Sequence, residues 1–152
     1  MNDTRIYDYY MGARASAALA VGVHIGLFDA LAEKATEIEE LAETLGFAHR
    51  PLVLLLSALM GMGLIRQDSG RYLLADDAAE FLVSGKPYWL GGLIQAELTC
   101  AFDPTLLLDA MQHDRSAVYG GKDPWETHSS DSEKARRFTA AMHSISARPA
   151  GA

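Results

Sequence analysis

A chain of 152 residues, of which 49% are hydrophobic and 22% charged, has the composition of a folded globular protein, which excludes wholesale disorder. Its formal net charge of -7 disfavours binding to nucleic-acid backbones and to anionic membrane surfaces. A single cysteine, Cys100, excludes a disulfide within one chain, and no signal peptide or membrane span is evident, so we expect a cytoplasmic protein.

The N-terminal segment predicts two helices rich in small residues. Ala and Leu favour a first helix from Thr4 through Ala20, and Gly22 and Gly26 are expected to break it. A short apolar helix over 25–31 follows. Small side chains recur at helical spacing in this segment, which indicates that another helix packs closely against it.

A capping box and an apolar helix follow in the sequence. Thr36 and Glu39 have the spacing at which the Thr hydroxyl accepts from the Glu amide, ahead of a helix that ends at Gly46. Pro51 suits the first turn of the next helix, over 52–60. Because that helix is apolar on nearly all sides, we expect it to be buried on most of them.

A β-hairpin is predicted after this helix. Strands over 64–67 and 71–74 flank the turn 68–70, and Asp76 or Asp77 can cap a short helix beyond it. Helix, turn, helix and hairpin in this order follow the winged-helix plan.

A winged helix raises the question of DNA binding. A DNA-reading helix carries polar side chains that reach base edges, but only Arg50, just before the apolar helix, is basic. Arg66 and Arg71 on the hairpin are the best candidates for a DNA contact. We therefore keep a winged-helix DNA-binding regulator as an alternative, and favour a homodimer in which the apolar helices are buried.

The second half is predicted to be helical, over 89–102 and 104–112, with a loop at 119–125. The last helix carries one apolar stripe, which consists of Ala135, Phe138, Met142 and Ile145. The five histidines are scattered, and no zinc pattern, P-loop or nucleophile elbow is present. We therefore predict neither a metal site nor a catalytic residue.

The order of these segments resembles the N-terminal part of class I S-adenosylmethionine-dependent O-methyltransferases of the caffeate, hydroxyindole and bacterial polyketide type. The resemblance covers almost the whole chain. The matching segments are 20–31, 39–42, 51–65, 72–74, Trp89, 120–126 and 138–142.

The resemblance implies a mainly α fold with one small β-hairpin. Residues 1–86 would form a winged-helix-like dimerisation region that makes a homodimer through its N-terminal helices. Residues 87–152 would form C-terminal helices that act as a substrate lid and lead to a Rossmann-like methyltransferase domain. The function implied is dimerisation and capping of the pocket for an aromatic or polyketide-like acceptor.

The resemblance also assigns substrate-binding residues. Phe138 and Met142 match the Phe-x-x-x-Met pair that lines the acceptor site, and sulfur and ring edges pack well on a flat phenolic ligand. Trp125 and Ser146 fall where the family often has an aromatic and a small polar residue. Ordinary helix packing is the alternative interpretation for all four residues.

The chain departs from the family in one large respect. By this resemblance, we expect the strand and glycine-rich loop that bind the cofactor, and the catalytic histidine, to lie beyond Ala152. The glycines at 61–63, 91–92 and 120–121 lack the required preceding strand or spacing.

We therefore expect no cofactor bound by this chain alone, S-adenosylmethionine only in the full-length family, and no catalytic activity. Whether the chain acts as an enzyme is left uncertain, as are the acceptor and the methylated atom. A standalone small-molecule binder or an accessory protein is a further alternative.

Overall fold

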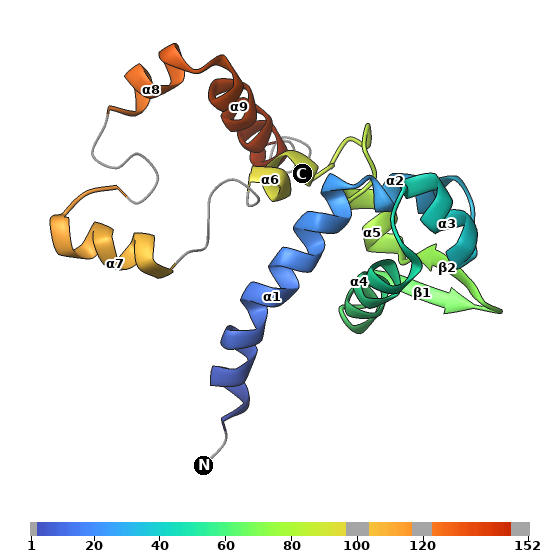
Figure 1. Cartoon of the computed structure of the whole chain (residues 1–152). Coiled ribbons are helices and arrows are strands. Elements are labelled where there is room, and N and C mark those ends of the chain that lie inside the picture. Colours follow the sequence, from blue (N-terminus) through green and yellow to red (C-terminus); the bar gives the residue numbers. More distant parts are fainter. Residues whose placement is uncertain (1–2, 97–103, 117–122, 147–152) are drawn as a thin grey trace.

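The computed structural model describes residues 3–96, 104–116 and 123–146. The described residues form nine helices and one small two-stranded sheet, which confirms the mainly α fold (Figure 1). In chain order the elements are α1 (Thr4–His24), α2 (Leu27–Glu33), α3 (Ile38–Leu45), α4 (His49–Gly61), β1 (Ile65–Asp68), β2 (Arg71–Leu74), α5 (Asp76–Phe81), α6 (Gly91–Ala96), α7 (Pro104–His113), α8 (Pro124–Ser130) and α9 (Ser132–Ser146).

Helix α1 runs further than the sequence predicted, because Gly22 lies inside it. A Cβ at Gly22 would lie 3.0 Å from Phe28 Cε2 and 3.3 Å from Leu59 Cδ1. The glycine therefore lets α1 approach both α2 and α4, as the recurrence of small residues indicated. The break comes at Gly26, whose φ of 72° is in the left-handed region.

The capping box predicted at Thr36 is wrong. Helix α3 begins at Ile38, with Glu37 at the N-cap and no side-chain cap bond. Thr36 is buried, and its backbone N and O pair with Tyr72 O and N at 3.0 and 2.9 Å. Its hydroxyl donates to the Lys34 carbonyl at 2.9 Å. Pairing with the hairpin removes Thr36 from the helix end and holds the start of α3 beside β2.

The hairpin agrees with the prediction within one residue. Its antiparallel register pairs Ile65 with Leu74 and Asp68 with Arg71. Ser69 and Gly70 both have positive φ, 49° and 84°, as a two-residue turn of type I′ requires.

Most of the core of the molecule lies between α1, α2, α4, the hairpin and α5. The buried residues of this cluster are Val23, Leu27, Phe28, Leu31, Leu41, Leu52, Leu56, Leu59, Ile65, Tyr72, Leu74, Ala78 and Leu82.

The apolar helix α4 packs one side into the core of its own chain, and burial of its other side by a second subunit stays a prediction. Leu52, Leu56 and Leu59 recur at i, i+4 and i+7 and point into the core formed with α1, α3 and β1. Leu54, on the outer side, is 63% exposed.

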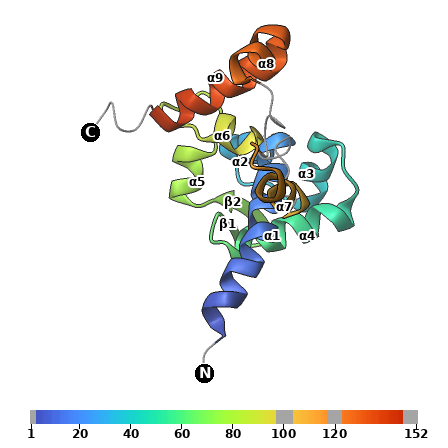
Figure 2. The same cartoon turned by 90° about the vertical axis from the view of Figure 1, so that its left-hand side faces the viewer.

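The C-terminal helices are built outward from α1. Helix α6 packs on α1, α9 packs on α6, and α8 packs on α9. Figure 1 shows helix α7 apart from these elements, and in the view of Figure 2 it lies in front of α1. Of the helix predicted over 89–102, α6 covers 91–96, and residues 97–103, which include Cys100, lie outside the described part.

The loop predicted at 119–125 needs a correction at its end. Pro124 begins helix α8, and the Asp123 carboxylate caps it by accepting from the Trp125 and Glu126 amides at 2.7 and 3.1 Å. Residues 117–122 lie outside the described part.

Within the described ranges, no single helix is long and apolar enough to cross a membrane. Only the pairs α1–α2 and α3–α4, which are bent by 60° and 108°, reach the length and hydropathy of a span.

Candidate acceptor lid and subunit interface

Helix α9 has a buried side and an exposed apolar side. Ala141 and Ser144 are buried, and a Cβ on Gly92 of α6 would lie only 2.7 Å from the Ala140 carbonyl oxygen and 2.9 Å from Ser144 Oγ. The backbones of α6 and α9 therefore touch at Gly92. This contact fixes which side of α9 faces away from α6.

The exposed side of α9 carries Phe138, Met142 and Ile145 at i, i+4 and i+7. Their side chains are 45%, 40% and 48% exposed. Large apolar side chains in a row on a surface helix indicate a face that binds something apolar, because singly scattered ones need no such explanation. The stripe predicted from the sequence is thus present.

The structure places the four predicted substrate-binding residues on two helices. Phe138 and Met142 are neighbours on α9, and Ser146 is one turn further along. The Ser146 hydroxyl donates to the Met142 carbonyl at 2.7 Å, an i to i−4 bond that anchors it on its own helix. Trp125 lies in the first turn of α8, on a different helix from the other three, with 80% of its surface exposed.

Gly92 is a positioning residue that the sequence analysis did not identify. The pair Gly91-Gly92 was considered there only as a nucleotide-binding loop. The space beside the Gly91 Cα is occupied by the ring of the neighbouring Trp89. The space beside the Gly92 Cα is occupied by the backbone of α9. Two adjacent glycines at the start of a predicted helix are the signal that could have indicated close packing.

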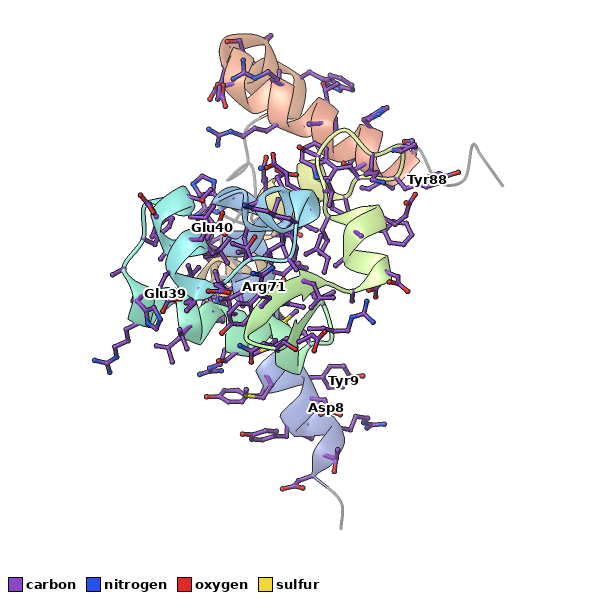
Figure 3. The ribbon with its side chains drawn as sticks, turned by 90° about the vertical axis from the view of Figure 1, so that its right-hand side faces the viewer. Asp8, Tyr9, Glu39, Glu40, Arg71 and Tyr88 are labelled. Atoms are coloured by element: carbon purple, nitrogen blue, oxygen red, sulfur yellow. The ribbon has the colours of Figure 1, made fainter. Side chains whose placement is uncertain are left out.

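The N-terminal half of α1 is a second candidate surface. It extends away from the core, and it exposes Ile6, Tyr7, Tyr9 and Tyr10 by 58–75% (Figure 1). Figure 3 shows Tyr9 pointing outward beside Asp8.

Aromatic and cationic groups are organised along this half of α1. The Arg14 guanidinium lies 4.3 Å from the Tyr10 ring centroid and donates to the Tyr10 hydroxyl at 2.8 Å. The Tyr7 and Tyr10 rings are 6.3 Å apart. Tyrosine and arginine are the residue types that are enriched at protein–protein interfaces.

The comparisons with known proteins identify the family. Residues 7–84 match the family model of the O-methyltransferase dimerisation domain, so the chain belongs to this family. The resemblance inferred from the sequence is thus confirmed.

Two curated relatives and one solved structure illustrate the likeness. The 3-hydroxy-5-methyl-1-naphthoate 3-O-methyltransferase of Streptomyces sahachiroi is 37% identical over 92 residues, which cover 60% of this chain and 27% of that protein. The N,N-dimethyltransferase OxyT of Streptomyces rimosus is 30% identical over 133 residues, which cover 85% and 39%.

The solved structure of PigF with SAH has a TM-score of 0.79 and 26% identity, and covers 95% of this chain and 45% of that one. The chain therefore spans less than half the length of these three proteins.

The described residues do not fit a site for the family's cofactor. The expected cradle is a glycine-rich loop between a parallel strand and a helix, whereas the described strands form a single antiparallel hairpin. The spaces at Gly91 and Gly92 are filled by protein atoms. Across the same residues, no group of three or more His, Cys, Asp or Glu side chains could hold a metal ion.

Proposed function

We propose that this chain is the dimerisation and acceptor-lid region of an S-adenosylmethionine-dependent O-methyltransferase. The match of residues 7–84 to the dimerisation family is the observation on which this proposal depends. The acceptor would be an aromatic or polyketide-like small molecule, and the naphthoate methyltransferase among the relatives supports that class.

The proposal divides the chain into two parts. Residues 1–86 would be the dimerisation region with a winged-helix plan, supported by the order α3, α4, β1, β2. Residues 87–152 would be the lid and the link to a Rossmann-like domain that binds the methyl donor. Because α6 and α9 pack closely at Gly92, a dimer formed through α1 would also fix the position of the lid.

The proposed chemical role of the lid is orientation of the acceptor and exclusion of water. Phe138, Met142 and Ile145 would cover one face of a planar ring, and contact of a thioether with a ring edge is favourable. Holding the acceptor in one orientation removes entropy from the barrier to methyl transfer. Trp125 and Ser146 would border the same face.

The homodimer would form through the exposed half of α1. Exposed tyrosine and isoleucine side chains there would be buried between two copies, and the Arg14–Tyr10 pair would lie within the contact. Among the described residues of the matched segment, this half of α1 exposes the most large apolar side chains, so it is the face that most needs a partner.

The alternative of a DNA-binding regulator gains no support from the hairpin. Arg66 pairs with Asp76 at 3.2 Å, and Arg71 pairs with Glu37 at 3.4 Å. Figure 3 shows Arg71 on the same side of the molecule as Glu39 and Glu40, whose charges would repel phosphate.

The lid proposal is tested by titrating the chain with 3-hydroxy-2-naphthoate as the probe while the methionine methyl signals are followed by NMR. The Met142 methyl is expected to shift with saturation, and Phe138→Ala is expected to weaken binding. His143→Ala is the matched control on the same helix. Shifts confined to other methionines, or equal binding by the two variants, would contradict the lid.

The dimer proposal is tested by sedimentation velocity over a range of protein concentrations. The chain is expected to dimerise, and Tyr10→Asp is expected to weaken the dimer because it places a carboxylate in an apolar contact. Glu43→Gln, a charge change on an exposed side chain of α3 outside the proposed contact, serves as the control. A chain that is monomeric at every concentration would refute the proposal.

A further inference from the structure

Residues 82–90, the connecting segment, join the dimerisation region to the helices that carry the candidate lid. The segment leaves α5 after Phe81 and enters α6 at Gly91 (Figure 1). The match to the dimerisation family ends at residue 84, inside this segment. Helix α6 in turn touches the backbone of α9 at Gly92. The course of the connecting segment therefore affects where the apolar stripe of α9 lies relative to the dimerisation region.

The connecting segment is held near its start by a carboxylate from a distant helix. Asp29 lies in the first turn of α2, and its Oδ1 accepts a hydrogen bond from the Ser84 backbone amide at 2.7 Å. The two residues are 55 positions apart in the chain. A carboxylate in the first turn of a helix is favourable because of the helix dipole, but this one also reaches out of its own helix. It links α2 directly to the connecting segment.

Backbone hydrogen bonds continue this attachment toward α6. Gly85 has a φ of 79°, in the left-handed region, and so turns the chain directly after Ser84. The Lys86 amide then donates to the Val83 carbonyl at 3.4 Å, and the Trp89 amide donates to the Lys86 carbonyl at 3.2 Å. The connecting segment therefore consists of consecutive hydrogen-bonded turns.

The end of the connecting segment is closed onto α5 and leads directly into α6. The Leu90 amide donates to the Phe81 carbonyl at 2.8 Å, and the Ile94 amide donates to the Leu90 carbonyl at 3.0 Å. The rings of Phe81 and Tyr88 lie 6.5 Å apart. A displacement of the turn at Ser84 would therefore be transmitted to the first turn of α6.

The packing of α6 on α1 defines the place of α6 less well than this hydrogen bond does. Packed helices shift past one another by about 1–2 Å in conformational changes. A hydrogen bond of 2.7 Å is short and directional, and it weakens steeply when its donor turns away. Misplacement of reacting groups by about 1 Å can slow a reaction about a hundredfold, so a lid needs the more precise attachment.

We propose that Asp29 is a positioning residue for the acceptor lid. Its carboxylate fixes the turn at Ser84, and the connecting segment then fixes α6 and the apolar stripe of α9 relative to the dimerisation region. Asp29 acts through these contacts and does not itself touch the acceptor. This rests on the proposed function of α9 as the lid.

Residual dipolar couplings of the backbone N–H groups test the proposal in the whole chain. Asp29→Ala removes the accepting oxygen, whereas Asp29→Asn keeps one in the same place. In the unaltered chain and in Asp29→Asn, one alignment tensor should describe α1 to α5 together with α6 and α9. In Asp29→Ala, the couplings of α6 and α9 should depart from the tensor of α1 to α5 by more than the measurement error.

Three comparisons make this test specific to position. A loss of stability alone leaves the couplings of the folded chain unchanged, because they report on folded molecules. Glu33→Ala removes another exposed carboxylate from α2 and should behave like the unaltered chain. Asp29→Glu keeps the charge but moves the oxygens by one methylene, so it should also displace α6 and α9, and it replaces Asp29→Ala if that variant does not fold. Couplings that fit one tensor in both Asp29→Ala and Asp29→Glu would overturn the proposal.

Titration with 3-hydroxy-2-naphthoate, followed at the Met142 methyl, connects position with binding. The apparent dissociation constant rises as the fraction of molecules with the lid in place falls, so Asp29→Ala should raise it by about threefold or more. Asp29→Asn should restore it. Displaced α6 and α9 with unchanged binding would overturn the role of Asp29 in the lid. An unaltered chain that binds no naphthoate would refute the lid itself, whereas a chain that binds equally well in all variants would refute only the role of Asp29.

Discussion

Gly92 determines how closely α9 approaches α6. In Gly92→Ala the new methyl group would lie 2.7 Å from the Ala140 carbonyl oxygen, and a helix backbone cannot yield as a flexible side chain would. We expect the two helices to be forced apart and the free energy of unfolding to fall by about 1–3 kcal/mol. Urea denaturation at one fixed protein concentration measures it.

Gly12→Ala is the control for this prediction. Gly12 is also helical, but no atom lies within 4 Å of its added Cβ. Replacing an exposed helical glycine by alanine should raise the free energy of unfolding by about 0.5–1 kcal/mol. If Gly92→Ala were also stabilising, α9 would not be held at this contact.

Asp109 offers a pH prediction with a definite sign. Its pKa is lowered mainly by the hydrogen bonds from Arg115. A carboxyl group whose pKa is lower in the folded protein than in the unfolded chain stabilises the fold at pH values above its unfolded pKa. This stabilisation is lost as the pH falls through the pKa of the folded state. Arg115→Gln should therefore raise the Asp109 pKa toward its ordinary value, as read from an NMR titration of the carboxyl carbon below about pH 5. An unchanged pKa in that variant would mean that Arg115 does not hold the carboxylate.

Helix α4 is the element that distinguishes burial within the chain from burial by a partner. Leu56 is fully buried and Leu54 is 63% exposed, two positions apart on the same helix. Leu56→Ala should lower the free energy of unfolding by about 2–5 kcal/mol, through lost burial and the cavity left behind. Leu54→Ala should change it by no more than about 0.5 kcal/mol.

Denaturation of both variants over a range of protein concentrations checks this expectation. If Leu54→Ala destabilised the chain as strongly as Leu56→Ala, and more so at high concentration, a partner would cover the outer side of α4. The assignment of the interface to α1 would then be wrong.

The elements that could be predicted from the sequence are those determined by residues close to them in the chain. The helix-forming apolar run of α4 and the turn residues of the hairpin depend on neighbours in sequence, and both elements were predicted closely, although α4 buries one side rather than most of its sides. Thr36 and Gly22 were misread because distant residues determine their state: Tyr72 takes the backbone of Thr36, and Phe28 and Leu59 surround Gly22. Local patterns do not contain such contacts.

The candidate lid shows the same division. The apolar stripe through Phe138 and Met142 follows from helical spacing and is present on α9. The roles of Trp125 and Ser146 came from the resemblance alone, and they stay predictions. Gly92 was missed because the atoms that leave no room for a side chain there belong to the backbone of α9, about fifty positions further along the chain.

At the scale of the whole molecule, the proposal separates the lid from the binding of the methyl donor. The described strands are antiparallel, and protein atoms occupy the space beside the glycines at 91–92. The described residues therefore form no binding loop for an adenosyl group. We expect isothermal titration of this chain with S-adenosylmethionine to give no saturable heat, whereas the naphthoate probe shifts the Met142 methyl in the same preparation. The second measurement shows that the protein is folded and competent to bind. Saturable one-to-one binding of S-adenosylmethionine would mean that the chain holds a donor site of its own, and the division of labour between lid and donor domain would have to be abandoned.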